Sequence, residues 1–164
     1  MTDPATPQTP PFVRAWLTRQ PGQLIGKGHP AGDFLEAYEW RILEEREGSL
    51  RIRAHVPAHV KNPRGQLFGG FTPTYVDLVA LFTVRAGEQR LAQRFRTWLA
   101  TTNMRVDYFE PIVGPHFVME SRLIKQRGRT NFVETRFFDP ENTLAVFALT
   151  TLREVSLDRP LGDV

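Results

Sequence analysis

Cysteine is absent from the 164-residue sequence and serine is rare, and both shortages exclude classes of chemistry. Without cysteine the chain can form no disulfide, no thiol nucleophile and no thiolate metal site. The serines are Ser49, Ser121 and Ser156, and none lies in the Gly-x-Ser-x-Gly turn that carries the nucleophile of many hydrolases. We therefore expect a chemistry that depends on neither a thiol nor a serine nucleophile.

The few histidines give little support for a metal site. His55 and His59 are four residues apart, but Pro57 between them prevents the regular helix that would bring their side chains together. His29 and His116 stand alone beside prolines. A glycine-rich phosphate loop ending in Lys-Ser or Lys-Thr is also absent. We expect no metal and no such loop.

Long apolar runs are missing as well. The longest, Tyr75 to Val84, is too short to cross a bilayer, and nothing resembles a signal peptide, so we expect a cytoplasmic protein without membrane contact. The net charge of +3 and the pI near 9.7 suit a small anionic ligand but are too mild to indicate nucleic-acid binding. A hydrophobic content of 41% predicts a substantial core.

The chain reads as one domain between two short end segments. Residues 1–11 hold four prolines and predict a disordered leader, residues 12–158 form the domain, and residues 159–164 are a tail. Within the domain, alternating residues predict a hairpin that turns at Gly48-Ser49 and four further strands. These strands cover residues 100–109, 117–126, 130–138 and 143–155. The last begins with apolar residues at nearly every position, which predicts a strand covered on both faces.

The segment between the hairpin and these strands predicts a helix from Gly70 to about Ala86. Pro73 is tolerated in a first helical turn, and Gly87 offers a stop. The segment is apolar nearly all round, so we expect the helix to be buried on most sides. The sequence therefore predicts an α+β domain in which a long antiparallel sheet wraps around one central helix.

Asp77 is the one carboxylate in this apolar helix, and it is the leading candidate for chemistry. A buried carboxylate is costly unless it is paired, hydrogen-bonded or beside a cavity. One interpretation is that Asp77 faces solvent or meets an arginine; the other is that it acts on a bound group. A helix that starts at Gly69 and Gly70 favours the second, because its unpaired N–H groups can polarise a carbonyl oxygen.

Asn62 to Asp77 reads NPRGQLFGGFTPTYVD, which resembles the signature of the hotdog-fold acyl-CoA thioesterases of the phenylacetate-degradation and 4-hydroxybenzoyl-CoA thioesterase type. That signature is Asn-x-x-Gly-x-x-His-Gly-Gly followed by an acid seven residues after the second glycine. TTNMRVDYFEPIVG and KQRGRTNFVETRF are similar to the strand and the hairpin that follow in the family. The resemblance covers roughly residues 33–155 and implies a hotdog fold.

The resemblance also implies roles for four residues. Asp77 matches the acid that activates water or attacks the acyl carbon, and Gly69 matches the glycine whose amide binds the thioester oxygen. Asn62 matches a polar residue beside the reacting carbonyl; alternatively, it only forms a turn. Thr101 falls where a relative has a serine that orients the site; alternatively, it is a strand hydroxyl without a role.

Phe68 departs from the family pattern, because it occupies the position of the signature histidine and cannot form that hydrogen bond. We expect hydrolysis to survive with an altered rate or acyl preference, since a thioester has a good leaving group and needs no dedicated general acid. The rival hypothesis is a non-catalytic acyl-CoA-binding protein that senses or sequesters its ligand. A hotdog dehydratase or hydratase is disfavoured because no histidine lies between His59 and His116.

Seven residues separate Gly70 from Asp77, about 10 Å along a helix, which is too far for one thioester to touch both. The family resolves this in a dimer, so the resemblance implies an obligate homodimer, which can pair further into a tetramer. Coenzyme A then enters only as part of the substrate, with no separate cofactor. We expect its phosphates near basic residues and its acyl group near apolar ones. The substrate-binding candidates are Lys125, Arg127 and Arg129, with solvated charge as the alternative, and Phe68, Gly70, Phe71 and Tyr75.

Overall fold

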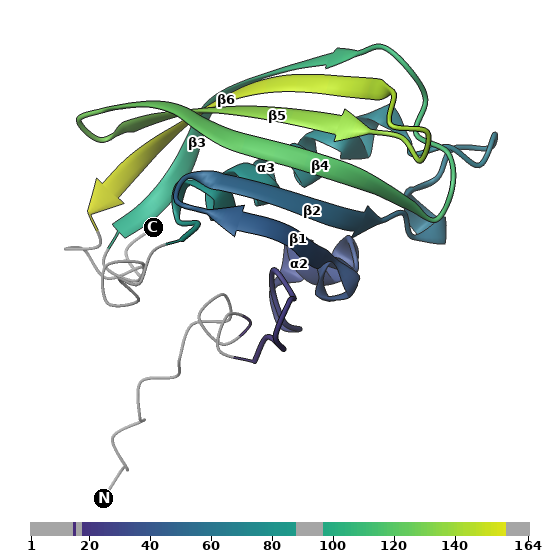
Figure 1. The fold of residues 1–164 in the computed structure, drawn as a ribbon, viewed down its shortest axis with the longest axis horizontal. Helices are drawn as coiled ribbons and strands as arrows, with labels where there is room; N and C mark the ends of the chain where they lie inside the picture. Colours follow the sequence, from purple (N-terminus) through teal and green to yellow (C-terminus); the bar gives the residue numbers. More distant parts are fainter. Residues whose placement is uncertain (1–14, 16–17, 88–96, 157–164) are drawn as a thin grey trace, which may run out of the picture.

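A six-stranded antiparallel sheet curves around one central helix in the computed structural model, which describes residue 15 and residues 18–87 and 97–156 (Figure 1). The predicted leader and tail lie outside the described residues. The strands are β1 Arg41–Arg46, β2 Ser49–His55, β3 Thr97–Tyr108, β4 His116–Arg127, β5 Thr130–Phe138 and β6 Leu144–Ser156. Their order is β1-β2-β4-β5-β6-β3, which leaves β3 at an edge. The helices are α2 Pro30–Phe34 and α3 Thr72–Val84, with 3-10 turns at Ala37–Glu39, Ala58–Val60 and Gly69–Phe71. The predicted α+β architecture is confirmed.

The first hairpin forms as predicted, with a small shift in its turn. Leu50, Ile52 and Ala54 alternate on the buried face of β2. The turn falls at Glu47 and Gly48, one residue earlier than expected, and Gly48 has the positive φ of 64° that such a turn favours. The Gly48 N–H donates to the carbonyl of Ala86, so the hairpin turn closes against the end of α3.

Helix α3 is shorter than predicted at both ends. It is preceded by a 3-10 turn at Gly69–Phe71, in which the Phe71 N–H donates a hydrogen bond to the Phe68 carbonyl. The α-helix itself begins at Thr72. Pro73 lies in the first α-helical turn, where its missing N–H costs nothing. The helix ends at Val84, and Gly87 follows with a φ of 71°, as the predicted stop requires.

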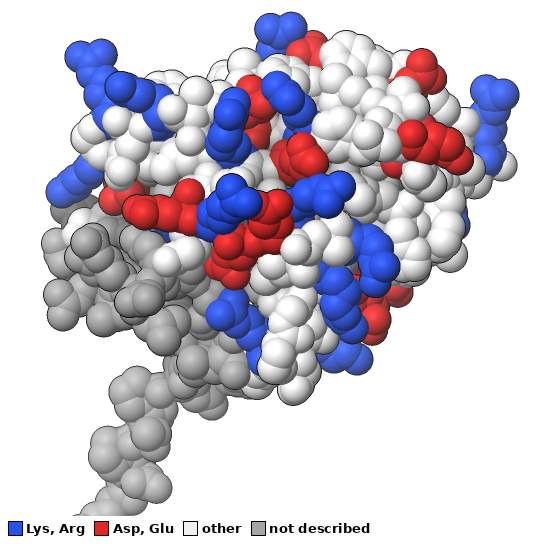
Figure 2. Space-filling view, viewed as in Figure 1, with Lys and Arg blue, Asp and Glu red and all other residues white. Residues whose placement is uncertain are grey.

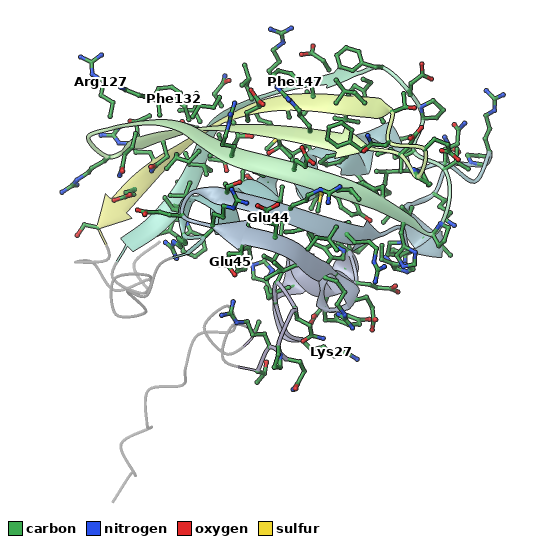
Figure 3. All side chains as sticks on the ribbon, viewed as in Figure 1. Lys27, Glu44, Glu45, Arg127, Phe132 and Phe147 are labelled. Carbon is green, nitrogen blue, oxygen red and sulfur yellow. The ribbon has the colours of Figure 1, made fainter. Side chains whose placement is uncertain are left out.

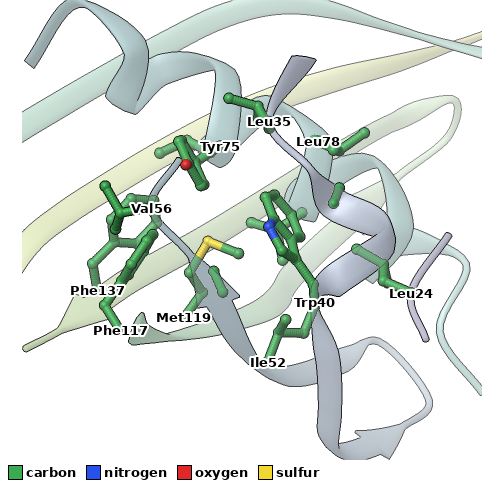
Figure 4. Packing of buried hydrophobic residues seen from close by; sticks show 14 of the residues in the cluster. Leu24, Leu35, Trp40, Ile52, Val56, Tyr75, Leu78, Phe117, Met119 and Phe137 are labelled. Atoms are coloured by element: carbon green, nitrogen blue, oxygen red, sulfur yellow. The ribbon is translucent and has the colours of Figure 1, made fainter. Parts of the chain in front are cut away.

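The core between the sheet and α3 is rich in aromatic rings (Figure 4). Tyr75 of α3 stacks on Trp40 with ring centroids 5.3 Å apart, and it contacts Phe117 and Phe137 from the sheet. Met119 fills the space beside them. Burying one such side chain stabilises a fold by about 1.5–3 kcal/mol. This packing determines which face of α3 is buried against the sheet.

Strand β6 meets the expectation that it is covered on both faces only over its first residues. Ala145 and Val146 are both buried, whereas from Ala148 onward burial alternates and Leu149 is exposed. In the described part of the chain no second layer covers the outer face of the sheet. Acidic and basic side chains instead interleave over that face (Figure 2), in pairs such as Arg136 with Glu134 at 2.8 Å. The apolar run therefore indicates two-sided burial only at the start of β6, and strand propensity beyond it.

Candidate active site

Within the described part of the chain, two adjacent backbone amides at the start of the helix have no hydrogen-bond partner. The Phe68 N–H donates to the Val60 carbonyl at 2.9 Å and the Phe71 N–H donates to Phe68 at 2.9 Å. Between them, the amides of Gly69 and Gly70 form no hydrogen bond with another described residue. Unpaired amides at a helix start can stabilise an oxygen that gains negative charge. The sequence-predicted role of Gly69 requires this arrangement.

Asp77 lies half-buried on α3, and one of its oxygens is already held. The Thr101 hydroxyl, from edge strand β3, donates to Asp77 Oδ1. No ion pair joins Asp77 to a basic residue within the described ranges, which disfavours the interpretation that it neutralises an arginine. The contact from Thr101 is the one that an orienting residue must make. A carboxylate held in this way can accept a proton or attack a carbon.

The face of α3 that carries Asp77 is not fully covered by the sheet. Thr74, Asp77, Leu81 and Val84 are all half-buried and are spaced by three or four residues, so they share one side of the helix. The fully buried residues, among them Tyr75 and Val79, fill the other sides. The prediction that α3 is buried on most sides is confirmed, and the remaining side is mostly apolar apart from the carboxylate.

A cavity of about 280 Å³ opens beside the helix start. Gly69 and Thr72 line it from the helix start, Tyr108 from the end of β3, Ile112 from the β3–β4 connection and Val146 from β6. The Tyr108 hydroxyl donates to the Gly69 carbonyl at 2.8 Å. Sequence analysis did not identify Tyr108 as a site residue. Its only sequence signal is its place at the end of a predicted strand.

The Asn62 side chain forms its hydrogen bonds within its own turn. Its Oδ1 accepts from the backbone N–H groups of Arg64 and Gln66 at 2.9 and 3.1 Å, and its Nδ2 donates to Gln66 Oε1 at 3.1 Å. These bonds support the alternative role as a turn residue. They do not support the predicted contact with a reacting carbonyl.

The predicted acyl-contacting residues fall into two groups. Phe68 is 50% exposed and its ring lies edge-on to Phe71 at 5.7 Å, so both stay available beside Gly70. Tyr75 is different: its exposure is 0% and its hydroxyl donates to the His55 carbonyl at 2.9 Å. Burial, aided by the charge of Glu36, raises its pKa. The prediction that Tyr75 contacts substrate is therefore wrong, because its ring belongs to the core.

Lys125, Arg127 and Arg129 are exposed at the β4–β5 hairpin, with Arg127 at its tip (Figure 3). Tyr108, next to the helix start, pairs with Val146 of β6. The β4–β5 hairpin pairs with β6 seven residues beyond Val146, so along the strand it lies about 23 Å from the helix start of the same chain. The hairpin lies closer to the end of the sheet where Thr101 holds Asp77. The role of these basic residues in phosphate binding stays a prediction.

The described residues contain no group of three histidine, cysteine, aspartate or glutamate side chains able to hold a metal ion. His55 instead pairs with Glu36 at 2.9 Å, and His59 contacts the Phe34 carbonyl at 2.6 Å. Among the same residues, no helix combines the length and apolarity needed to span a membrane.

The site region lies within the match to a known protein family. A family model described as the thioesterase superfamily matches residues 64–146, just over half of the chain. The match begins just before the glycines of the helix start and ends at Val146, so it includes Asp77, Thr101 and Tyr108. No curated protein sequence matches the chain.

Solved structures share the fold at low sequence identity. A hypothetical thioesterase from Streptococcus pneumoniae with coenzyme A has 15% identity and a TM-score of 0.61 over 72% of this chain and 87% of that one. A thioesterase from Haemophilus influenzae has 14% identity and a TM-score of 0.65 over 80% and 86%. A Streptococcus mutans protein bound to acetyl CoA has 14% identity and a TM-score of 0.59 over 72% and 90%. Together with the sheet and its central helix, these similarities establish the predicted hotdog fold.

Proposed function

The chain belongs to the thioesterase superfamily, and from this membership we propose that it hydrolyses an acyl-CoA to a free acid and coenzyme A. One observation carries the proposal. The Gly69 and Gly70 amides at the start of one helix have no hydrogen-bond partner among the described residues, and two turns further the same helix bears the Asp77 carboxylate held by Thr101. These are the two parts that thioester hydrolysis needs, a donor for the carbonyl oxygen and a group that delivers the nucleophile.

The proposed reaction uses the two parts in sequence. The Gly69 amide binds the thioester oxygen and stabilises the negative charge that forms on it. Asp77 removes a proton from water as the water oxygen bonds to the acyl carbon, or else attacks that carbon itself to give an anhydride that water cleaves. The carbon–sulfur bond then breaks and coenzyme A leaves as a thiolate, which takes up a proton. The good leaving group explains why the missing histidine at Phe68 does not prevent the reaction.

We propose further that the working unit is a homodimer with two composite sites. The helix start and Asp77 stand about 10 Å apart on one helix, so one thioester reaches both only if each chain contributes one part. Two features support association: the half-buried side of α3 that carries Asp77, and strand β3, which is an edge strand of the sheet in the described part of the chain. Pairing of dimers into a tetramer stays a prediction.

Coenzyme A as the carrier is supported by relatives and by charge. Two of the structurally similar proteins were solved with coenzyme A or acetyl CoA. In the proposed dimer, we expect the basic hairpin of the chain that supplies Asp77 to bind a nucleotide phosphate, because the hairpin lies toward the end of the sheet where Thr101 holds Asp77. The cytoplasmic location stays a prediction.

The test of the proposed function is hydrolysis of a panel of acyl-CoAs, monitored by release of the free thiol. Asp77→Asn should abolish turnover and leave the dimer mass and the binding of a non-hydrolysable analogue unchanged, because the amide keeps the size of the side chain. Asp107→Asn is the matched control: Asp107 lies on the same edge strand as Thr101 but pairs with Arg105 at 3.0 Å, away from the helix. Turnover of Asp77→Asn at the wild-type rate would contradict the mechanism.

The alternative is a binding protein without catalysis, and the exposed Phe68 ring favours it, since the position offers no hydrogen bond to a substrate. The same panel separates the two functions. Tight binding of several acyl-CoAs without thiol release from any of them supports a sensor or sequestering role. Thiol release from one of them excludes it.

A further inference from the structure

Tyr108 connects the edge strand to the start of the helix. It is the last residue of β3, and its hydroxyl donates to the Gly69 carbonyl at 2.8 Å across 39 residues of sequence. Its ring also lies against this glycine: a Cβ at Gly69 would stand 3.5 Å from Tyr108 Cε1. The ring is 52% exposed and borders the cavity beside the helix start. Tyr108 is thus positioned to act on the site without being part of the core.

The hydrogen bond fixes an amide as well as a carbonyl. The Gly69 carbonyl and the Gly70 N–H belong to one planar peptide unit and point in opposite directions. Whatever holds the carbonyl therefore also aims the Gly70 N–H. The Thr72 N–H donates to the same oxygen, so both of its lone pairs are used. Without these two bonds, a Gly-Gly pair would rotate with little hindrance.

The same two bonds strengthen the Gly70 N–H as a donor. A hydrogen bond to the carbonyl of a peptide unit draws electron density from its nitrogen, so chains of such bonds reinforce one another. Gly70 is an exposed residue, and its amide forms no hydrogen bond with another described residue. It is therefore a polarised donor with its position free for a ligand oxygen.

We propose that Tyr108 is a positioning residue that aims and polarises the Gly70 N–H, so that this amide joins the Gly69 amide as a second donor to the thioester oxygen. The inference rests on the proposed function and adds a donor and a residue that sets its direction. Tyr108 itself touches neither the acyl carbon nor the attacking water in this account, because its hydroxyl hydrogen is used by the Gly69 carbonyl.

Strand β3 then orients both parts of the machinery. Near its start Thr101 holds Asp77, and at its end Tyr108 holds the peptide between Gly69 and Gly70. In the proposed dimer, each composite site would combine amides held by one chain's Tyr108 with a carboxylate held by the other chain's Thr101. An edge strand that also joins the two chains would couple assembly to the geometry of both sites.

The test replaces Tyr108 by phenylalanine, which keeps the ring against Gly69 and removes only the hydroxyl. Removing a whole oxyanion donor lowers kcat by about 10²- to 10³-fold. Because Tyr108 only orients and polarises one donor, we expect Tyr108→Phe to lower kcat less, by about 5- to 30-fold. KM should stay within about twofold, because the bond matters most when negative charge develops on the oxygen. Tyr38→Phe is the matched control and should keep the wild-type kcat, because the Tyr38 ring packs against the Lys27 ammonium at 4.5 Å and not against Gly69.

A second measurement distinguishes positioning from a structural tie. In protein labelled with ¹⁵N-glycine, Tyr108→Phe should move the Gly70 amide proton upfield, because its peptide carbonyl loses one of two hydrogen bonds. The melting temperature of Tyr108→Phe is compared with that of Tyr75→Phe, which also removes a tyrosine-to-carbonyl bond but leaves the amides untouched. A lower melting temperature of Tyr108→Phe without a lower kcat would show that Tyr108 stabilises the fold but does not position a catalytic donor.

The outcomes separate this inference from the proposed function. If the wild type hydrolyses acyl-CoA and Tyr108→Phe matches its kcat, or if the Gly70 amide shift does not change, the inference is wrong and the proposed function stands. If the wild type releases no thiol from any acyl-CoA, the proposed function fails and the catalytic role of Tyr108 fails with it. A reduced kcat with an unchanged KM and a shifted Gly70 amide supports the inference.

Discussion

Replacing Thr101 by valine removes the hydroxyl that donates to Asp77 and preserves the shape of the side chain. A hydrogen bond to a charged group contributes about 1.5–3 kcal/mol. Thr101 is exposed, so water replaces part of this contribution, and we take the lower end of the range. Because each 1.36 kcal/mol is a factor of ten in rate, kcat/KM should fall about tenfold. The loss should appear in kcat, since the bond orients Asp77 and does not bind the substrate.

The assay is thiol release from the best acyl-CoA of the panel, with two companion variants. Thr101→Ser keeps the hydroxyl and should retain most of the activity. Thr102→Val removes the neighbouring hydroxyl, which donates to the Thr151 carbonyl at 3.2 Å and not to Asp77, and it should leave kcat/KM unchanged. A wild-type rate in Thr101→Val, or an equal loss in Thr102→Val, would refute the reasoning, because the effect would then not pass through Asp77.

Two further predictions concern stability. Gly87→Ala should destabilise the fold by about 1–3 kcal/mol in urea unfolding, because the φ of Gly87 is 71° and a Cβ there would lie 2.6 Å from the Glu47 backbone. The control is Gly128→Ala: Gly128 has a similar φ but open space around it, so the substitution should cost less stability. Equal losses in the two variants would contradict the role of the contact with Glu47. Separately, burial lowers the pKa of His29, whose neutral Nδ1 accepts from the Gly32 N–H at 3.0 Å. The unfolded state then binds more protons, so the melting temperature should fall as the pH drops through 6.5. His29→Asn, a good helix cap that does not titrate, should reduce this slope between pH 7.5 and 5.5; an unchanged slope would assign it to other groups.

The residues expected to contact the acyl group lie on other elements than the residues that orient the groups proposed to act. Phe68 and Phe71 lie beside the amides and pack on each other, and Asp77 with its Thr101 contact lies further along the helix. We expect replacement of either ring to change what the site accepts with little effect on the groups proposed to act. The peptide held by Tyr108 and the carboxylate held by Thr101 are set by one strand and tolerate less change. Recognition and chemistry therefore rest on different elements.

Much of the fold was predictable because its signals are local. Alternating residues bounded by turn signals predicted the segment 130–138, and β5 is Thr130–Phe138. Pro73 and Gly87 marked the ends of the helix to within two or three residues, since each restricts the backbone at its own position. Asp77 stood out because one carboxylate in an apolar helix is costly wherever that helix packs.

Tertiary structure alone decided which side chains meet. The apolar pattern could not tell that Tyr75 belongs to the core while Phe68 stays half-exposed, because both occur in the same apolar segment. The contacts of Asp77 with Thr101 and of Gly69 with Tyr108 span 24 and 39 residues, and they depend on β3 pairing with β6 at the edge of the sheet. Local periodicity carries no information about such distant pairing. The sequence determined the elements, the candidate acid and, through the family resemblance, Thr101 as a candidate, whereas the folded sheet determined that Thr101 meets Asp77 and that Tyr108 meets Gly69.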